Sequence, residues 1–217
     1  MDFHHPNYTG SGSIKYSTND IDITVQNTKL TPVEICVLSE DIVDTGIQFI
    51  NYNPLVLNVI DDSFSGEYVQ YGIGAGEESI FRRSNYFRTL NINFNLIKNN
   101  EVIYSPDVSI FKMGQKNGFQ KCSPFKLSFV ACSGINYPKL KEDGRMYDDD
   151  LQILENKIDL IFKVAIKHNH RSIILCAFGC GVWMNNPENF APVFRKIIDK
   201  YKNTNVIELV VFTIIQK

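Results

Sequence analysis

Residues 171–215, RSIILCAFGCGVWMNNPENFAPVFRKIIDKYKNTNVIELVVFTII, hold two apolar runs with an amphipathic segment between them. The runs at 171–178 and 205–215 are apolar on consecutive positions, which is typical of strands buried on both faces. The segment 187–202 follows two asparagines, opens with a proline and places its apolar residues on one stripe, so it is predicted to be a helix. A strand, a helix and a second strand in this order predict a parallel strand pair and an α/β fold.

The same alternation extends towards the N-terminus. Further apolar runs predict strands at 33–38, 54–60 and 126–132, and helical periodicity is clear at 148–168 and weaker at about 41–51 and 77–90. Helices that connect parallel strands cover both faces of a mostly parallel sheet. No change of composition divides the chain, so we expect one domain over residues 21–217, preceded by a flexible arm at residues 1–20 that is rich in Asn, Gly and Ser.

Composition narrows the classes of protein. The 217 residues carry a formal net charge of -2, whereas proteins that bind nucleic acid directly usually have a basic excess. No apolar run approaches the roughly 20 residues of a membrane span, and the polar N-terminus lacks the apolar core of a secretory signal. The five cysteines are widely spaced, unlike a secreted disulfide scaffold, and three lie in apolar runs and are expected to be buried: Cys36, Cys132 and Cys176. We therefore expect an intracellular protein, cytoplasmic or nuclear, without a membrane partner.

Two loops are candidates for chemistry, because ligands of such sheets bind beyond the carboxyl ends of the strands. The first, DDSFSGEYVQYGIGAGEESIFRRS at 61–84, has glycines at 72, 74 and 76 just before a helix that begins at Glu77 and Glu78. Glycines let a ligand approach the backbone, and a helix start favours an anion. Two carboxylates in a first helical turn are also those of an ordinary N-terminus. The spacing is neither a dinucleotide fingerprint nor a P-loop.

The second loop, GCGVWMNNP at 179–187, follows a buried strand and leads into a helix. Small residues on both sides of a cysteine suit a diphosphate cradle built from backbone amides. Trp183, the only tryptophan, is placed either to stack on a sugar or base or to fill the edge of the core.

Cysteine and histidine offer two alternative kinds of site. His168, His170, Cys176 and Cys180 have the composition of a zinc site, but their spacing matches no usual ligand pattern. Cys180 lies in a polar loop near a helix start, where a thiol is a candidate nucleophile, although the sequence nominates no histidine to activate it.

The stretch 176–187, CAFGCGVWMNNP, resembles the G-A-W/F-G-C-G-V-F-x-N-x-P loop of microbial-type poly(ADP-ribose) glycohydrolases, a branch of the macrodomain superfamily. Three more segments follow the family's order and are similar to its motifs: LNVIDDSFSGEYVQYGIGAGEESIFRRS (57–84), IYSPDVSIF (103–111) and KLSFVACSGIN (126–136). Upstream, VLSEDIVDTGIQF (37–49) is similar to a T-N-E-T-T helix start. Together the resemblance covers residues 33–215 in collinear order.

The resemblance implies a three-layer α/β/α macrodomain with a mostly parallel central sheet. Its partner would be ADP-ribose or poly(ADP-ribose) on modified proteins, and it would cleave ribose glycosidic bonds without a metal or other cofactor. Glu78 corresponds to the family's general acid, which protonates the leaving oxygen of a glycoside. Glu77 would orient the ribose hydroxyls.

The resemblance also implies a set of ligand-binding positions. Backbone amides of the loop would surround the diphosphate, Trp183 would replace a family phenylalanine at the distal ribose, and Asn58 and Asp61 would face the same ribose. The loop positions implied for ligand contact are Gly66, Gly179, Cys180, Gly181 and Val182.

The chain departs from the family pattern in the loop before the two glutamates. Aligned backwards from Glu78, the family's three glycines fall on Gly66, Glu67 and Tyr68, and Gly76 replaces a glutamine. Bulky residues there would narrow the cleft for a diphosphate. The sequence therefore supports a glycohydrolase that uses Glu78, and leaves open a module that binds ADP-ribose or a related nucleotide without turnover, or a closed cleft used for protein contacts.

Overall fold

The computed structural model describes residues 12–24, 32–60, 76–90, 97–181 and 183–215. Its strands are β1 (Ile14–Ser17), β2 (Glu34–Leu38), β3 (Pro54–Ile60), β4 (Glu101–Lys112), β5 (Lys121–Ser133), β6 (Ser172–Cys176) and β7 (Leu209–Thr213). Its helices are α1 (Ile42–Gln48), α2 (Gly76–Arg83), α3 (Tyr86–Thr89), α4 (Asp148–Lys167) and α5 (Pro187–Tyr201), with short 3-10 turns at η1 (Ile50–Tyr52) and η4 (Gln115–Asn117).

The strands form a mixed sheet in the order β1-β4-β5-β3-β6-β7-β2. Neighbours from β5 through β3, β6 and β7 to β2 run parallel, whereas β1 and β4 are antiparallel to their neighbours. The strand–helix–strand unit β6-α5-β7 is the parallel pair predicted from residues 171–215. The predicted α/β class with a mostly parallel sheet is confirmed.

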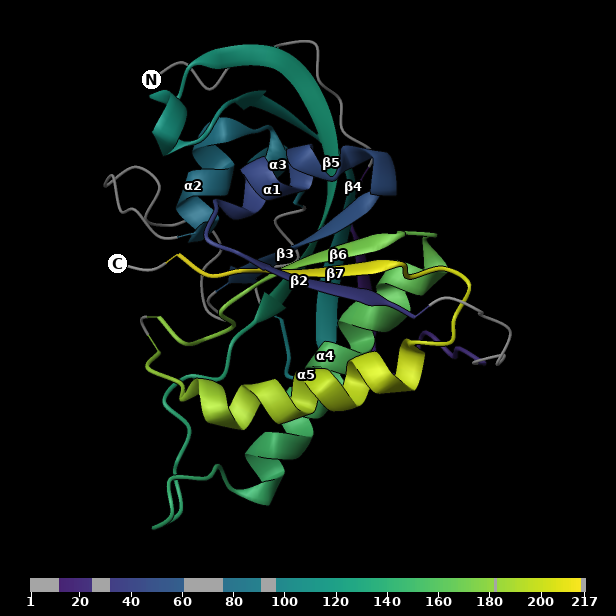
Figure 1. The fold of residues 1–217 in the computed structure, drawn as a ribbon, viewed down its shortest axis with the longest axis vertical. Coiled ribbons are helices and arrows are strands. Elements are labelled where there is room, and N and C mark those ends of the chain that lie inside the picture. The colour runs from purple at the N-terminus through teal and green to yellow at the C-terminus, as the bar shows by residue number, and fades with distance from the viewer. Residues whose placement is uncertain (1–11, 25–31, 61–75, 91–96, 182, 216–217) are drawn as a thin grey trace.

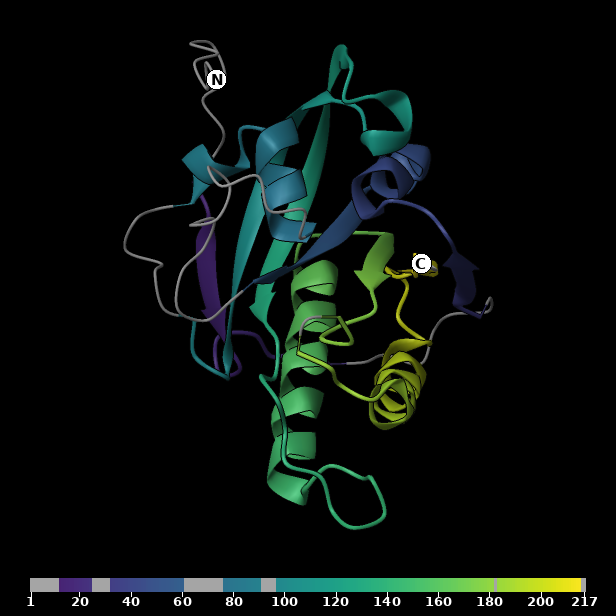
Figure 2. The ribbon, with the colours of Figure 1, turned by 90° about the vertical axis from the view of Figure 1, so that its left-hand side faces the viewer.

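Helices cover both faces of the sheet (Figures 1 and 2). Alternate residues of β3 show why: Leu55 and Leu57 pack into the core shared with α4 and α5, and Val56 packs into the core shared with α1, α2 and α3. Consecutive apolar residues are therefore buried on both sides, as expected for a covered parallel sheet. The predicted three layers are confirmed. None of the helices in the described ranges is both long and apolar enough to cross a membrane.

The segment 77–90, predicted as one helix, is two helices. Ser84 forms an isolated bridge with Ile110 of β4 between them. The backbone N–H of Asn85 donates to the Ser109 carbonyl (3.1 Å), and the Ser109 N–H donates to the Asn85 side-chain oxygen (2.8 Å). These bonds to a strand replace helical ones, so the end of α2 is attached to the sheet.

Residues 14–17 differ from the predicted arm. They form β1, which pairs antiparallel with β4, and Tyr16 is buried beneath it. Just before the strand, the Ser13 hydroxyl donates to the Thr89 carbonyl (2.8 Å) and lies 2.6 Å from the Ser105 hydroxyl. A four-residue strand is too short to show a period, so composition alone marked it as an arm. The rest of the arm, residues 1–11, lies outside the described residues.

The cysteines only partly follow the expectation of burial. All five are free thiols. Cys132 is fully buried on β5, as predicted, whereas Cys36 and Cys176 are only partly buried. Cys36 is less buried than predicted because β2 is an edge strand.

Arg83, the last residue of α2, is completely buried and connects three elements. Its guanidinium forms ion pairs with Asp41 (2.6 Å) and Asp44, and its Nε donates to the carbonyl of Lys112 on β4 (3.1 Å). Asp41 is also the N-cap of α1 and accepts from the backbone N–H groups of Val43 and Asp44. The network therefore fixes the position of α2 relative to α1 and to the sheet.

Replacing Arg83 by leucine should lower the free energy of unfolding by about 3 kcal/mol, because it removes one partner of a buried ion-pair network and leaves two carboxylates facing an apolar group. Urea unfolding at pH 7 measures the effect as a lower midpoint with an unchanged slope. Arg145→Leu is the control, since the Arg145–Asp143 pair is exposed and such pairs add little. Equal midpoints for both variants would contradict the role given to Arg83.

Candidate active site

The candidate site lies where β3, β5 and β6 end. The chain leaves β3 at Ile60 and returns at α2, and the loops after β5 and β6 run to α4 and α5. The carboxyl ends of parallel strands meet at one edge of a sheet, so these segments adjoin one another there.

Glu77 and Glu78 lie in the first turn of α2 and are both buried, 7% and 4% exposed. Oε2 of Glu78 forms no hydrogen bond with any described residue. Carboxylates of an ordinary helix start are solvated, and a buried polar atom without a partner is costly. The burial of both side chains therefore favours a binding or catalytic role over a simple helix start.

Asn58 on β3 is 1% exposed, and neither atom of its side-chain amide forms a hydrogen bond within the described part of the chain. The amide lies beside the hydroxyl of Tyr86, as does Ser105 of β4. Burial raises the pKa of Tyr86 far above its ordinary value; Ser105 and Asn58 oppose this rise, and the charge of Glu77 adds to it. Asn58 lies beside this buried hydroxyl, and Glu77 is near enough for its charge to raise the pKa of Tyr86.

The loop after β6 is held by Asn185, which is 3% exposed. Its side-chain Nδ2 donates to the carbonyls of Ile135 and Gly179, both at 2.9 Å, and its backbone N–H donates to Gly179 as well (3.2 Å). Gly179 has φ +71°, and a Cβ there would overlap the Asn185 amide. A glycine is therefore required both by the backbone conformation and by the space.

The same loop presents open backbone amides. Cys180 donates its N–H to Ala177 (3.0 Å), but the N–H groups of Gly179, Gly181 and Trp183 donate to no described residue. Several open N–H groups in one tight loop are the donor set that binds phosphate oxygens. The arrangement fits the predicted diphosphate cradle.

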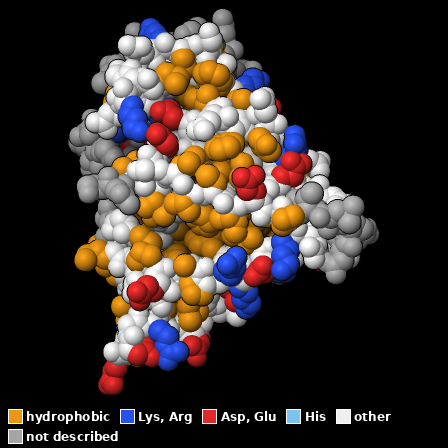
Figure 3. All heavy atoms as spheres, in the orientation of Figure 1, with side chains coloured by type: hydrophobic (Ala, Val, Ile, Leu, Met, Phe, Trp, Pro, Cys, Tyr) orange, Lys and Arg blue, Asp and Glu red, His pale blue; other side chains and the backbone are white. Residues whose placement is uncertain are grey.

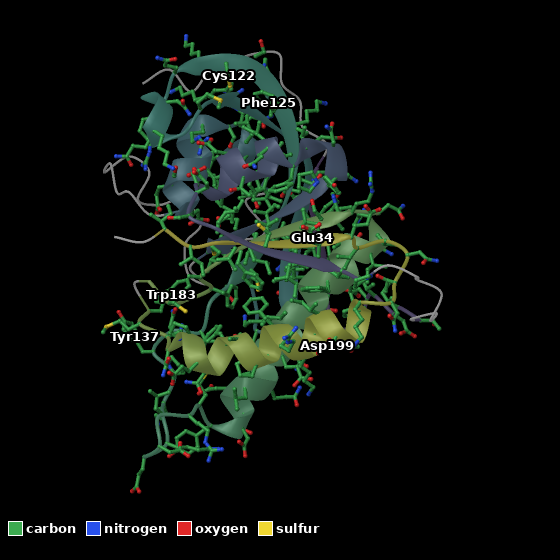
Figure 4. All side chains as sticks on the ribbon, viewed as in Figure 1. Glu34, Cys122, Phe125, Tyr137, Trp183 and Asp199 are labelled. Carbon is green, nitrogen blue, oxygen red and sulfur yellow. The ribbon has the colours of Figure 1, made fainter. Side chains whose placement is uncertain are left out.

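Trp183 is half-buried, and its ring packs against the backbone of Gly134 in the loop after β5. A Cβ at position 134 would overlap the ring. Figure 4 shows Trp183 above Tyr137, at the edge where the loops after β5 and β6 emerge. One side of the ring is thus fixed by a glycine, and the side chain remains accessible at the rim of the site.

Gly134→Ala should move the Trp183 ring and shift its fluorescence maximum to longer wavelength, because the new methyl group displaces the ring towards water. The protein has a single tryptophan, so the emission spectrum reports this ring alone. Gly181→Ala is the matched control, since a Cβ at Gly181 meets open space, and it should leave the spectrum unchanged. A G134A spectrum identical to that of the unmodified protein would show that Gly134 does not position the ring.

Several predicted site residues lie outside the described residues: Asp61, Gly66, Glu67, Tyr68 and Val182. Sequence reasoning did not find Tyr86, whose hydroxyl lies beside Asn58, or Ser105, which lies beside the same hydroxyl. No spacing marks them, because they come from α3 and β4, and only the fold brings them beside β3.

The two histidines and two cysteines considered as an alternative zinc site lie at opposite ends of β6. His170 Nε2 lies 3.1 Å from the Tyr104 hydroxyl, and His168 stacks on the Tyr104 ring with 3.9 Å between centroids. Both histidines precede β6, whereas Cys176 ends it and Cys180 follows, so the strand places them about 15 Å apart. Among the described residues, no group of three or more His, Cys, Asp or Glu side chains could hold a metal ion. Burial also raises the pKa of the Cys180 thiol, which disfavours a nucleophilic thiolate.

The pKa of His170 should make stability depend on pH. Burial, the largest cause, lowers it from 6.5 to about 4. The neutral ring donates from Nδ1 to the Asn53 carbonyl (2.9 Å) and accepts at Nε2 from Tyr104. Because the unfolded chain binds this proton more tightly, the contribution is complete above pH 6.5 and is lost, by up to about 3 kcal/mol, as the pH falls towards 4.

His170→Gln should therefore show a smaller loss of unfolding free energy than the unmodified protein between pH 6.5 and pH 4. Urea titrations at half-unit pH steps measure both slopes. Parallel slopes for the two proteins would contradict the depressed pKa.

A family model, that of the microbial-type PARG catalytic domain (PARG, poly(ADP-ribose) glycohydrolase), matches residues 8–113, just under half of the chain. This range includes Asn58, Glu77 and Glu78. The resemblance inferred from the sequence motifs is thereby confirmed, and the chain is related to PARG hydrolases at low sequence identity. No curated protein sequence matches the chain significantly.

Solved structures extend the likeness over nearly the whole chain. PARG from Thermomonospora curvata has 20% identity and a TM-score of 0.79, over 95% of this chain and 81% of that one. The same enzyme bound to the inhibitor ADP-HPD has 21% identity and a TM-score of 0.78, over 95% and 80%. PARG from Deinococcus radiodurans in complex with ADP-ribose has 18% identity and a TM-score of 0.76, over 95% and 88%. The fold is therefore that of PARG structures.

Proposed function

We propose that the protein is an ADP-ribosyl glycohydrolase that cleaves ribose glycosidic bonds of poly(ADP-ribose) or of ADP-ribosylated targets, with Glu78 as the general acid. The observation that carries the proposal is the buried Glu78 carboxylate, whose Oε2 has no partner among the described residues. A related PARG structure contains ADP-ribose and another contains ADP-HPD, which supports ADP-ribose as the ligand.

The unpartnered atoms support a polar ligand at this place. Glu78 offers one carboxylate oxygen, and Asn58 offers an amide oxygen and nitrogen, all buried and without a hydrogen bond to the described residues. Each such atom costs on the order of 1–3 kcal/mol unless a ligand or water satisfies it. A ribose, with hydroxyls that donate and accept, has the groups to satisfy them.

The reaction would follow from these positions. Glu78 donates its proton to the glycosidic oxygen as the bond to the ribose C1″ breaks, and positive charge develops on the ring as an oxocarbenium ion. Water attacks C1″ and a proton returns to the carboxylate, with a substrate phosphate assisting. Glu77 and Asn58 would hold the ribose hydroxyls, which keeps C1″ in line with the acid.

The loop after β6 would bind the rest of the substrate. The open N–H groups of Gly179 and Gly181, together with the neighbouring Cys180 and Val182 positions, suit the two phosphates, and Trp183 suits the face of the distal ribose. Asn185 holds this loop in place, and Gly134 holds the Trp183 ring.

A binding module without turnover is the second candidate. In an ungapped alignment from Glu78, Glu67 and Tyr68 take the places of two family glycines, and a carboxylate beside a diphosphate would repel it. Both candidates use the same residues and the same ligand, so they differ in one measurable property, which is the release of ADP-ribose from a polymer.

Glu78→Gln should reduce the release of ADP-ribose from poly(ADP-ribose) by about 10²–10⁴-fold, because the amide keeps the shape and loses the acidic proton. Its affinity for free ADP-ribose should stay within about tenfold of the unmodified protein. Chromatography of the products measures turnover, and calorimetric titration measures binding.

Two glutamine variants serve as comparisons. Glu77→Gln should weaken both binding and turnover, because it orients the ribose, and Glu142→Gln, on the exposed loop after β5, should change neither. Binding by the unmodified protein without release of ADP-ribose would establish the module instead. A collapse of affinity in E78Q would show that Glu78 binds the ligand or maintains the fold and is not the acid.

A further inference from the structure

β2 is an edge strand with an open outer side. It pairs with β7. The Glu34 N–H donates to the Glu208 carbonyl (2.8 Å), and the Ile214 N–H donates to the Leu38 carbonyl (2.9 Å). In a parallel ladder alternate residues bond the same neighbour, so the N–H and C=O groups of Ile35 and Val37 point away from β7. They bond no other described residue. Figure 2 shows β2 outermost, beyond both α1 and α5.

The same strand exposes apolar side chains. Val37 is 64% exposed and Ile35 42%, on the side of the sheet that α4 and α5 cover elsewhere. In Figure 3 a hydrophobic band crosses this face of the molecule, with the acidic side chain of Glu34, labelled in Figure 4, at its border. A regular, apolar strand at an open edge is a template for pairing with another strand.

β1, at the opposite edge of the sheet, has features that prevent pairing with another strand. β1 has only four residues, and its Lys15 pairs with Glu101 of the neighbouring strand (3.3 Å). Charged side chains and short length are common means of blocking an edge. β2 carries no lysine, proline or bulge. β2 is therefore the edge of the described sheet that is available for pairing.

We propose that β2 pairs antiparallel with β2 of a second copy of this chain, about a two-fold axis that passes beside Cys36. In this register the outward N–H and C=O groups of Ile35 form hydrogen bonds with those of Val37 of the second copy. Those of Val37 bond Ile35 of the second copy in the same way. Ile35 and Val37 of the two copies then cover one another on the exposed face. A two-fold axis pairs the outward backbone groups of both strands through the same surface on each copy, because the contact of Ile35 with Val37 occurs twice.

Charge supports a second copy over another occupant. Glu34, at the amino end of β2, forms no ion pair within the described ranges. Lys116 lies near the carboxyl end, where it pairs with Glu40 (2.8 Å) and remains 66% exposed. Antiparallel pairing brings the amino end of one β2 to the carboxyl end of the other. Glu34 then faces Lys116 of the second copy, and the symmetry makes this contact twice.

The pairing leaves the candidate active site open. Antiparallel pairing reverses the strand direction of one copy relative to the other. The loops after β3, β5 and β6 of the two copies therefore lie on opposite sides of the joined sheet, away from β2. The inference therefore does not depend on the proposed function, and the tests below measure assembly alone.

Sedimentation velocity of the unmodified protein, from low micromolar concentration to about 1 mM, should show a monomer–dimer equilibrium. Val37→Lys should weaken the dimer at least about tenfold, because it places a charge opposite the apolar Ile35 of the second copy and sets the two lysines diagonally across the axis. Ile14→Lys is the matched control, since Ile14 is also an exposed apolar residue (41%) on an edge strand, and it should not change the equilibrium. A monomer at about 1 mM, or a dimer that V37K leaves intact, would overturn the proposal.

Cross-linking tests the register. Cys36 would face Cys36 of the second copy as a non-hydrogen-bonded pair with Cα atoms about 4.5 Å apart, within the range of a disulfide. Mild oxidation with copper phenanthroline, which takes one electron from each thiol as its proton is lost, should give a covalent dimer. Cys122→Ser should retain this product and Cys36→Ser should lose it. A covalent dimer that persists in C36S would rule out this register.

Discussion

The buried guanidinium of Arg83 is the constraint on which the arrangement of the site depends. One side chain joins the end of α2 to the cap of α1 and to a carbonyl of β4. α2 has only eight residues and is too short to hold its place by its own hydrogen bonds. Because its first turn carries Glu77 and Glu78, the position of both carboxylates is set from the opposite end of the helix. A guanidinium buried at one end of α2 thus positions the two buried carboxyl groups at the other end.

The candidate site combines rigid supports with polar groups that the fold leaves unsatisfied. Asn185 uses its Nδ2 twice to join two loops, and Gly134 gives the Trp183 ring a flat surface. Asn58 and Glu78 keep buried atoms without protein partners in the described chain, and so does Asn185 at Oδ1. Proteins violate the rules of polar satisfaction mainly where they bind or react. The Nδ2 bonds of Asn185 hold two loops together, and the unpartnered atoms are the ones that a ligand would satisfy.

Most of the strands and helices could be predicted from the sequence. The same physical reasons explain why β4, Tyr86 and Ser105 could not. Consecutive apolar residues in Pro54–Ile60 and Leu209–Thr213 could only be covered strands, and the stripe of α5 could only be a helix face. β4 carries Pro106 and a bulge with Asp107 at φ 52°, so its pattern is broken where the strand continues. Tyr86 and Ser105 could not be assigned to the site, because only the fold brings the Tyr86 hydroxyl beside Asn58 and Ser105. The glycine loop stays a prediction, since residues 61–75 are not described.

The pairing of β2 with β7 has a consequence for the order of folding. Glu34 lies opposite Leu209, so a strand near the start of the chain finds its neighbour only in the last one. Contacts between such distant segments form slowly, because a long loop must close before any bond is gained. During synthesis β2 therefore stays without its β7 partner until residues 209–213 have left the ribosome. Loss of the last strand would release the first strand of the parallel ladder as well, although the two are separated by nearly the whole chain.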